Sequence, residues 1–157
     1  MLSILIVCTA NMCRSPMAEA ILKRLVAERA DASRWHIESA GTWASQGSPP
    51  VPLAQIAMQS QGLDISLHRS QPVNNELIQK FDLILTMENH HKEGLQNQFK
   101  QYYERIFMLS EMIGLVENIP DPVGGDLEDY VATANRLERI LSNGLPKIFQ
   151  LALIPKA

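Results

Sequence analysis

The sequence predicts an α/β fold in which a parallel sheet is covered by helices. The first observation is that short apolar runs of strand length alternate along the chain with longer amphipathic runs of helix length. The second is the pair at the N-terminus, where a tight loop joins the apolar run 2–7 to an amphipathic run over 16–30. Parallel strands need such crossover helices, which then cover both faces of the sheet. The 157 residues suit a single domain, 1–157, with one core.

The boundaries of the elements follow from local patterns. Strands are expected over 2–7, 36–40, 83–87 and 105–109, and helices over 16–30, 53–62, 74–78, 89–99 and from Asp126 onward. In the second of these helices, Leu53, Ile56 and Ala57 are expected to face inward. The segment Asn143-Gly144-Leu145-Pro146 is expected to break or kink the last helix.

The loop after the first strand holds the residues with the clearest chemistry. It reads Cys8-Thr9-Ala10-Asn11-Met12-Cys13-Arg14-Ser15-Pro16. A loop this short between a strand and a helix turns several backbone N–H groups inward, and such a nest beside a helix N-terminus binds anions. The same field stabilises a thiolate, so Cys8 is expected to be a nucleophile. Arg14 offers a planar fork for two phosphoryl oxygens.

Three further residues of this loop have expected roles. Ser15 is expected to donate its hydroxyl to the Cys8 sulfur and also to cap the helix, with Pro16 at the first helical position. Asn11 is expected to adopt a left-handed conformation so that the loop can wrap. At Ala10 two outcomes are open: an ordinary backbone conformation, or a positive φ that costs about 1 kcal/mol or more.

The segment Val7–Glu19 resembles the signature of the low molecular weight protein tyrosine phosphatases. Related segments of that family fall at Ser39-Ala40-Gly41-Thr42, at 81–87, and at Ile119-Pro120-Asp121-Pro122. The resemblance implies a doubly wound three-layer fold with a four-stranded parallel sheet. It also implies a phosphoric monoester hydrolase that forms a cysteinyl-phosphate intermediate and uses neither a metal nor another cofactor.

The resemblance also implies the general acid. The family carries it at the Asp of the Asp-Pro pair, which is Asp121 here, and the same residue then activates water in the second step. Without the upstream loop, Asp121-Pro122 before Gly124-Gly125 would indicate only a turn. Asp126 and Asp129 are alternative acids, although Asp126 is expected to cap the last helix.

A supporting network and a redox role are implied in the same way. The family holds the Asn11 side chain with a Ser and a His, which correspond here to Ser39 and His68. Cys13 is expected to form a reversible disulfide with Cys8 that protects it from over-oxidation, and the alternative is a small buried residue under the loop.

The substrate can be one of two kinds. Residues 9–15 are expected to bind the phosphoryl group, and Trp43 either forms an aromatic wall for a phosphotyrosine ring or covers the edge of the core. The segment after Asp121-Pro122 looks more like the bacterial protein-arginine-phosphatase branch of the family. That branch has a threonine where this chain has Met12, and a bulky apolar residue there favours an aromatic ring. Phosphotyrosine is therefore the predicted substrate, with phosphoarginine as the alternative.

Two other functions fit the sequence less well. Arsenate reductases of related fold need a further cysteine pair downstream, whereas this chain contains only Cys8 and Cys13. A non-catalytic phosphate-binding or redox-sensing module would lack Cys8, Arg14 or Asp121, and all three are present. His90 and His91 lack partners at zinc spacing and are expected to face solvent.

Composition limits the partners and the compartment. The net charge of −3 gives no reason to expect nucleic acid, and no apolar run approaches the length that spans a bilayer. The N-terminus lacks the pattern of a secretory signal, and two cysteines in one loop are no disulfide framework, so the cytoplasm is expected. The expected partners are a phosphotyrosine-containing protein such as a bacterial tyrosine kinase, and inorganic phosphate or similar oxyanions as inhibitors. A monomer is expected.

Overall fold

A four-stranded, all-parallel sheet forms the centre of the molecule, in a computed structural model that describes residues 1–156. The strand order is β2-β1-β3-β4. The strands are β1 (Leu2–Cys8), β2 (Trp35–Gly41), β3 (Leu83–Thr86) and β4 (Ile106–Met108). In register, Ile4 of β1 lies opposite Ile37 of β2 and Leu83 of β3. The α/β class, the parallel sheet and its four strands are confirmed.

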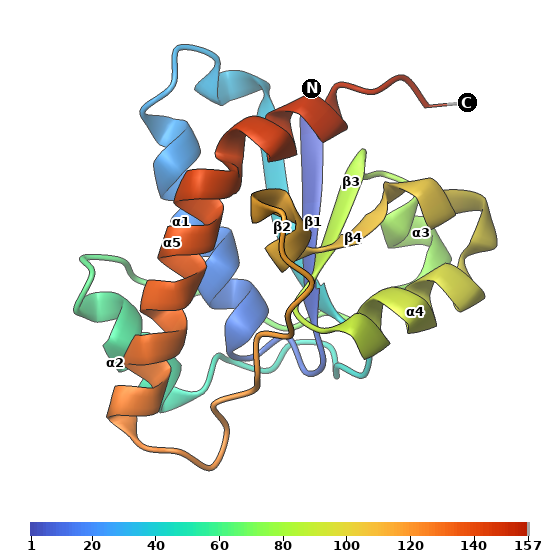
Figure 1. Ribbon diagram of the computed structural model, residues 1–157. Coiled ribbons are helices and arrows are strands. Elements are labelled where there is room, and N and C mark those ends of the chain that lie inside the picture. The colour runs from blue at the N-terminus through green and yellow to red at the C-terminus, as the bar shows by residue number, and fades with distance from the viewer. Residues whose placement is uncertain (157) are drawn as a thin grey trace.

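Helices cover both faces of this sheet (Figure 1). One face carries α1 (Arg14–Ala27) and α5 (Leu127–Ala152), with α2 (Pro52–Gln59) packed against α5. The other face carries α3 (Asn75–Ile78) and α4 (Asn89–Gln98). Three short 3₁₀ helices complete the chain at Ala32–Arg34, Lys100–Arg105 and Leu109–Ile113.

The alternation of side chains along β1 divides the core into two parts. Ile4 and Ile6 belong to the larger cluster, together with the buried residues of α1, α2 and α5. Leu5 and Val7 point to the opposite face and pack with Ile78, Phe81 and other residues around α3 and α4. Successive residues of a strand point to opposite faces, so a strand covered on both sides is mostly apolar, as β1 is apart from Ser3.

Helix α2 differs from its prediction, whereas the last helix bends without breaking, which is one of the two predicted outcomes. In α2 the buried residues are Ala54, Ala57 and Met58, spaced three and four apart on one face, whereas Ile56 lies on the other side and is 46% exposed. The last helix does not break at Pro146 but continues to Ala152, and its axis turns towards the C-terminal end (Figure 1). Burial of flanking residues such as Ile140 and Ile148 offsets the hydrogen bond that the proline removes.

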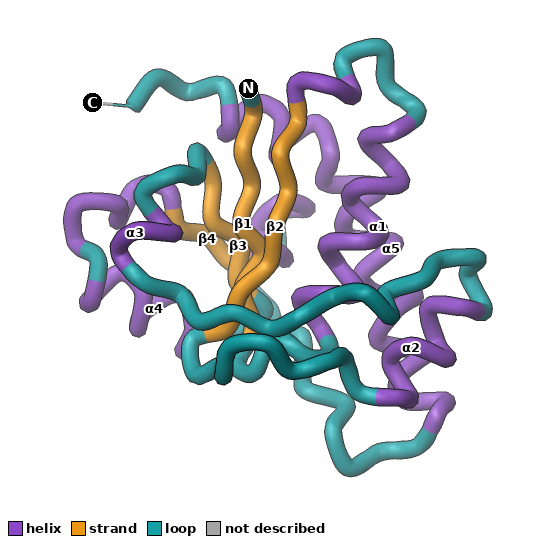
Figure 2. Tube along the Cα trace, turned by 180° about the vertical axis from the view of Figure 1, so that it is seen from behind, coloured by secondary structure: helices purple, strands orange, loops and turns teal. Residues whose placement is uncertain are grey.

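The connections gather at the carboxyl edge of the sheet. Figure 2 shows the two long segments 42–51 and 60–74 crossing beneath the ends of β1 and β2. Gly41 allows this approach, because a Cβ there would collide with the Thr9 carbonyl oxygen and the Ala44 side chain. Parallel α/β sheets bind ligands at this edge, so the fold places the loop 8–14 where a site is expected.

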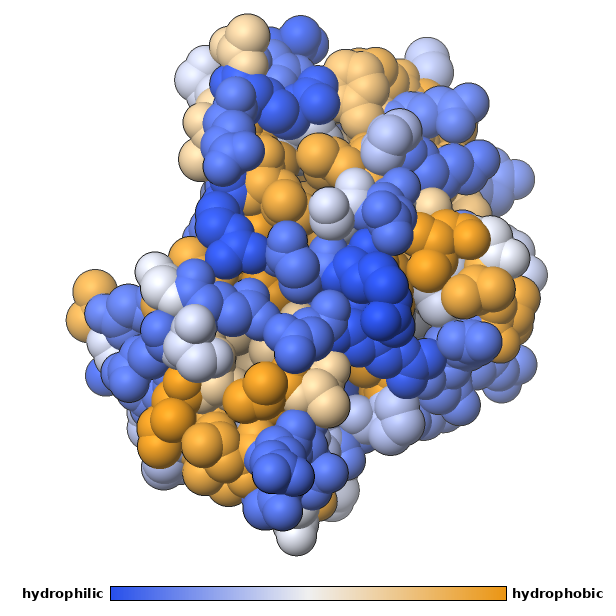
Figure 3. Space-filling view, turned by 60° about the vertical axis from the view of Figure 1, so that its left-hand side comes forward, coloured by the Kyte–Doolittle hydropathy of each residue, from blue (hydrophilic) through white to orange (hydrophobic). Residues whose placement is uncertain are grey.

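The surface is mixed in polarity. On the face in Figure 3, hydrophobic residues form separate patches divided by hydrophilic ones. Within residues 1–156, no helix combines the length and the apolar character needed to cross a bilayer.

Candidate active site

The loop that joins β1 to α1 wraps around a buried centre. Cys8 is the last residue of β1 and is 3% exposed, and Arg14 is the first residue of α1 and is 2% exposed. Asn11 has a φ of 58° and is the only residue other than glycine with positive φ in residues 1–156. The left-handed conformation predicted for Asn11 is therefore confirmed, and Ala10 needs no strained backbone.

The Asn11 side chain holds the loop closed. Its Nδ2 donates to Ser15 Oγ at 2.8 Å and to Ser39 Oγ at 2.9 Å, and its Oδ1 accepts from the Gln71 backbone N–H at 3.0 Å. Ser15 Oγ lies 2.9 Å from Cys8 Sγ. All the hydrogen-bonding groups of this buried amide are engaged with the protein, which stiffens the loop around the cysteine.

Ser15 does not cap the helix, contrary to the prediction. Helix α1 begins at Arg14, and its N-cap is Cys13, which makes no side-chain capping bond. Ser15 lies in the first turn, and its hydroxyl points into the loop towards Cys8 and Asn11. The Ser15 hydroxyl therefore bonds to polar groups of the loop and does not cap a backbone N–H of the helix.

Two further residues complete the network around Asn11. His68 Nε2 lies 2.8 Å from the Asn11 carbonyl oxygen, so it contacts the backbone and not the side chain. Ser39 Oγ donates to Glu19 Oε1 at 2.6 Å. Glu19 was not among the predicted network residues. Its position on α1, close to the loop, is the sequence feature that could have identified it.

The guanidinium of Arg14 is held from one side. Its Nη1 donates to Glu88 Oε2 and to the Ile119 carbonyl oxygen, each at 2.7 Å. Burial would raise the pKa of Glu88, but the hydrogen bond and charge of Arg14 outweigh it and hold that pKa below its usual value. Arg14 Nη2 lies 3.6 Å from Asp121 Oδ2. The side chain is therefore positioned before an anion binds.

Asp121 lies across the site from Cys8 in an exposed loop. Its side chain is 43% exposed, and its Oδ1 accepts from the Val123 backbone N–H at 3.0 Å. The alternative acids are engaged elsewhere: Asp126 Oδ1 accepts from the Asp129 backbone N–H, and Asp129 Oδ2 accepts from that of Asp126. This reciprocal pair is the N-terminal cap of α5, as expected for Asp126.

A cavity of about 270 Å³ opens above the loop. Its polar lining groups come from Cys8, Arg14 and Asp121. Its other lining residues are Ala10, Met12, Cys13, Val51 and Val123, which form its apolar walls. Met12 thus lines the cavity as expected, and the valine walls were not anticipated. Val51 is held in place because its backbone N–H donates to the Met12 carbonyl oxygen at 2.9 Å.

Trp43 lies elsewhere than either expectation placed it. Its side chain is 87% exposed, and it is not among the residues that line the cavity. Its backbone N–H donates to the Thr9 carbonyl oxygen at 2.9 Å, so the Trp43 backbone is bonded to the loop although its indole is exposed. In this structure Trp43 therefore neither walls the pocket nor covers the core.

The two cysteines are both reduced and buried. Burial, aided by the charges of Asp121 and Cys8 and opposed by Arg14, raises the pKa of the Cys13 thiol to about 12. Cys13 is therefore a neutral thiol near pH 7, unsuited to be a nucleophile itself.

His91 is buried, contrary to the prediction that both neighbouring histidines face solvent. It is 1% exposed, whereas the His90 side chain is 65% exposed. His91 Nε2 lies 2.8 Å from Thr9 Oγ1, and its Nδ1 accepts from the Glu88 backbone N–H at 3.1 Å. As the third residue of α4 it points towards the loop, a placement that only the docking of this helix could decide.

Glu88, His90 and His91 place possible metal-ligand atoms within 4.8 Å of one another. However, Glu88 Oε2 already accepts from Arg14, and both ring nitrogens of His91 are engaged. A metal would have to displace these bonds. The donors are thus arranged as a hydrogen-bonded cluster rather than as an open metal site.

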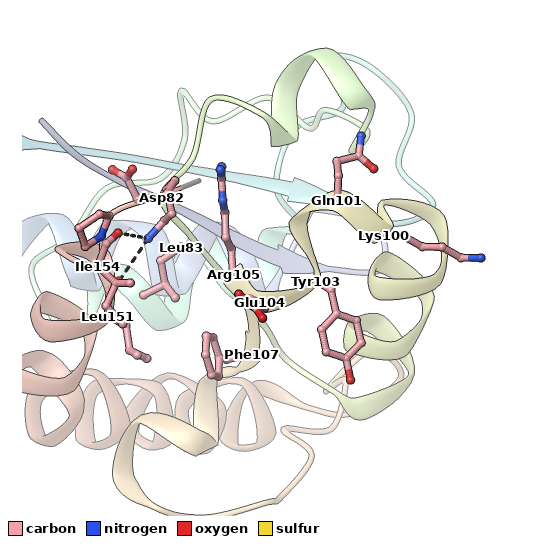
Figure 4. Close-up of a pocket in the computed structure, with 12 residues that line it drawn as sticks. Asp82, Leu83, Lys100, Gln101, Tyr103, Glu104, Arg105, Phe107, Leu151 and Ile154 are labelled. Carbon is pink, nitrogen blue, oxygen red and sulfur yellow. Dashed lines mark hydrogen bonds between the residues drawn. The ribbon is translucent and has the colours of Figure 1, made fainter.

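A second cavity, of about 330 Å³, lies at the opposite edge of the sheet (Figure 4). Its apolar lining includes Leu83, Phe107 and Leu151. Two of its charged residues are engaged: Asp82 Oδ2 accepts from Ser3 Oγ at 2.9 Å, and Arg105 Nη1 donates to the Phe81 carbonyl oxygen at 3.2 Å. It lacks a nucleophile and an anion-binding loop, so the cavity above Cys8 is the candidate active site.

A nucleophile, a phosphate nest and an opposed carboxylate at the carboxyl edge of a parallel sheet define a phosphatase of the cysteine-dependent class. The family model for low molecular weight phosphotyrosine protein phosphatases matches residues 3–150. The chain therefore belongs to that family, and the predicted enzyme class, a low molecular weight protein-tyrosine-phosphatase that hydrolyses phosphoric monoesters, is confirmed.

Relatives of both substrate branches resemble the chain. It is 37% identical over 141 residues to a protein-arginine-phosphatase of Bacillus subtilis, which covers 89% of this chain and 92% of that protein. It is 33% identical over 146 residues to the probable low molecular weight protein-tyrosine-phosphatase EpsP of Ralstonia nicotianae, covering 93% and 95%. The crystal structure of a low molecular weight protein tyrosine phosphatase from T. tengcongensis superposes with a TM-score of 0.87 at 36% identity, covering 94% of this chain and 99% of that one.

Proposed function

We propose that the chain, as a single domain over 1–157, hydrolyses phosphotyrosine in protein substrates through a cysteinyl-phosphate intermediate. In the first step, the Cys8 thiolate attacks phosphorus, an S–P bond forms, and the bond from phosphorus to the tyrosyl oxygen breaks. Asp121 gives its proton to that oxygen. In the second step, the Asp121 carboxylate takes a proton from water as the water attacks phosphorus, and Cys8 leaves as a thiolate.

The remaining residues position and stabilise. The backbone N–H groups of 9–14 and the Arg14 guanidinium bind the phosphoryl oxygens, with Glu88 and the Ile119 carbonyl holding Arg14 in place. Ser15 Oγ, 2.9 Å from Cys8 Sγ, donates to the sulfur as it leaves. Asn11, with Ser39 and His68, maintains the curvature of the loop. The same nest is expected to bind inorganic phosphate or similar oxyanions, which would then act as inhibitors.

The observation that carries the choice of phosphotyrosine is the apolar wall of the cavity. Met12, Val51 and Val123 surround the space above Cys8. A phenyl ring buries its faces against such side chains, whereas a charged guanidinium would lose its hydrogen bonds to water there. Two observations support the alternative, phosphoarginine: the segment after Asp121-Pro122 and the similarity to the Bacillus protein-arginine-phosphatase.

The partner and the compartment follow from the same chemistry. A phosphotyrosine protein, such as a bacterial tyrosine kinase, is the proposed substrate, and relatives named EpsP and Wzb carry the tyrosine-phosphatase name. A mechanism that depends on a reduced cysteine suits the cytoplasm, where thiols are kept reduced. The protein is proposed to act there as a monomer.

The test is phosphate release from matched phosphotyrosine and phosphoarginine peptides without added metal, wild type beside Cys8→Ser. We expect phosphotyrosine to be preferred and Cys8→Ser to be inactive, with Cys13→Ser as the matched control that keeps its turnover. Activity that survives in Cys8→Ser would contradict the mechanism. A phosphoarginine preference lost in Cys8→Ser would keep the mechanism and replace the substrate.

A further inference from the structure

His91 is a buried histidine that the proposed chemistry does not use. It lies between the two halves of the phosphate site. On one side, its Nε2 is 2.8 Å from the hydroxyl of Thr9, the residue directly after Cys8. On the other side, its Nδ1 accepts from the backbone N–H of Glu88, whose carboxylate holds Arg14. The His91 side chain therefore links Thr9, which follows the nucleophile, to Glu88, which orients the guanidinium.

The geometry fixes the protonation of the ring. A backbone N–H can only donate, so Nδ1 of His91 must be the unprotonated nitrogen. The proton of the neutral ring is then on Nε2, which donates to Thr9 Oγ1. The Thr9 hydroxyl is oriented as a result, because one of its lone pairs is committed to the imidazole.

The electrostatic surroundings keep the ring neutral. Burial, aided by the positive charges of His90 and Arg14 and opposed by Glu88, lowers the pKa of His91 to about 4. Near pH 7 the imidazole can therefore donate to Thr9 and accept from the Glu88 backbone at the same time. A protonated ring would have two donors and would lose the bond to Glu88.

We propose that His91 is a positioning residue for dephosphorylation, which keeps Cys8 and Arg14 in register by tying Thr9 to the turn that carries Glu88. The proposal rests on the phosphatase function above. The bridge positions the phosphate-binding groups before substrate arrives. Its loss should therefore weaken the binding of the phosphoryl group, which is the same in every substrate. We therefore expect the loss to be similar for good and poor leaving groups, unlike the loss of a general acid.

The first test is a double-mutant cycle on the Thr9–His91 hydrogen bond. Thr9→Val removes the hydroxyl but keeps the shape and the backbone N–H. His91→Asn keeps an oxygen near the position of Nδ1 for the Glu88 N–H and loses the reach to Thr9. We expect each single variant to lower kcat about tenfold and to weaken inhibition by inorganic phosphate, and the double variant to lose little more. Losses that multiply to about a hundredfold, or no loss at all, would overturn the proposal.

Two controls distinguish an effect on the positioning of the site from an effect on folding. His36→Asn makes the same exchange at a half-exposed histidine paired with Glu38 on β2, and its kcat should match wild type. If His91→Asn does not fold, His91→Gln replaces the cycle by a rescue test, because its amide N–H₂ can reach Thr9 Oγ1. Turnover in His91→Gln should be retained better than in Thr9→Val, and an equal loss would contradict the bridge.

A second measurement does not depend on catalysis. Nitrogen-15 NMR of the wild-type imidazole should report a proton on Nε2 of His91 and an unprotonated Nδ1, unchanged between about pH 8 and pH 5. A ring that titrates with an ordinary midpoint would overturn the proposal even in an active enzyme. A wild-type protein that releases no phosphate but gives the expected spectrum would instead contradict the proposed function.

Discussion

Two loops meet at the carboxyl edge of the sheet, and they are built in opposite ways. The loop around Cys8 is held by buried polar residues: Asn11 and Ser15 are both 0% exposed, and only Ala10 at its tip is exposed. The loop that carries Asp121 is open, with the Asp121 side chain 43% exposed and Val123 62% exposed. The open loop is anchored at its ends, by Ile119 N–H to the Met87 carbonyl at 2.9 Å and by the cap at Asp126.

The difference corresponds to the part of the substrate that each loop contacts. The phosphoryl group is the same in every substrate, and fixed donors stabilise its charge at no cost of rearrangement during the reaction. The leaving group and the protein around it vary, so the residue that protonates it is on a segment that can adjust. The apolar walls show the same division, since Met12 belongs to the buried loop and Val123 to the open one.

Apart from the loss of the nucleophile Cys8, the largest expected effect on turnover comes from the open loop. In Asp121→Asn the bond from the Val123 N–H can persist, so the fold is expected to remain. Loss of the proton donor should lower kcat by about 10²–10⁴-fold, and most for poor leaving groups. The measurement is kcat against the pKa of the leaving phenol in a series of aryl phosphates.

Asp126→Asn is the matched control for Asp121→Asn, since asparagine caps a helix about as well as aspartate. Its turnover should stay near wild type. An equal loss for Asp121→Asn across all leaving groups would place the acid elsewhere in this loop.

The buried loop should respond through stability as well as turnover. Asn11→Ala removes three hydrogen bonds and places alanine at a φ of 58°. We expect the free energy of unfolding to fall by about 2–4 kcal/mol, and kcat to fall about 10–100-fold. Denaturant unfolding and steady-state kinetics measure the two changes.

Asn11→Gly separates the two causes in the buried loop. Glycine adopts the positive φ freely but supplies no side chain, so it should be about 1 kcal/mol more stable than Asn11→Ala and equally impaired in turnover. Turnover restored by glycine would mean that the backbone conformation matters and the side-chain network does not.

The smallest effect on turnover is expected at Cys13, and its importance should appear only on oxidation. Peroxide converts the Cys8 thiolate to a sulfenic acid, which condenses with the Cys13 thiol to a disulfide and releases water. Wild type should therefore recover with a thiol reductant, and Cys13→Ser should lose activity irreversibly at high peroxide. Identical recovery in both proteins would leave Cys13 as a packing residue.

Sequence reasoning succeeded where the causes are local. The apolar run 2–7, the left-handed Asn11 and the cap at Asp126 each follow from residues within a few positions of one another, and each is found in the structure. The predictions for Ser15, Trp43 and His91 were wrong, because each of these side chains could lie in either of two environments. The free hydroxyl of Ser15 could cap a helix or turn into the loop, and the density of polar groups around Cys8 decided the outcome.

The sequence alone determined the succession of strands and helices along the chain, the phosphate loop and its family. Hydrophobic periodicity and loop chemistry are encoded in neighbouring residues. Only the tertiary structure decided how Arg14 is held, how His91 reaches the loop, and which side chains wall the cavity. Glu88 lies 74 positions from Arg14, and His91 lies 82 positions from Thr9. Such pairs form only when strands and helices pack, and no local pattern specifies which distant residues packing brings together.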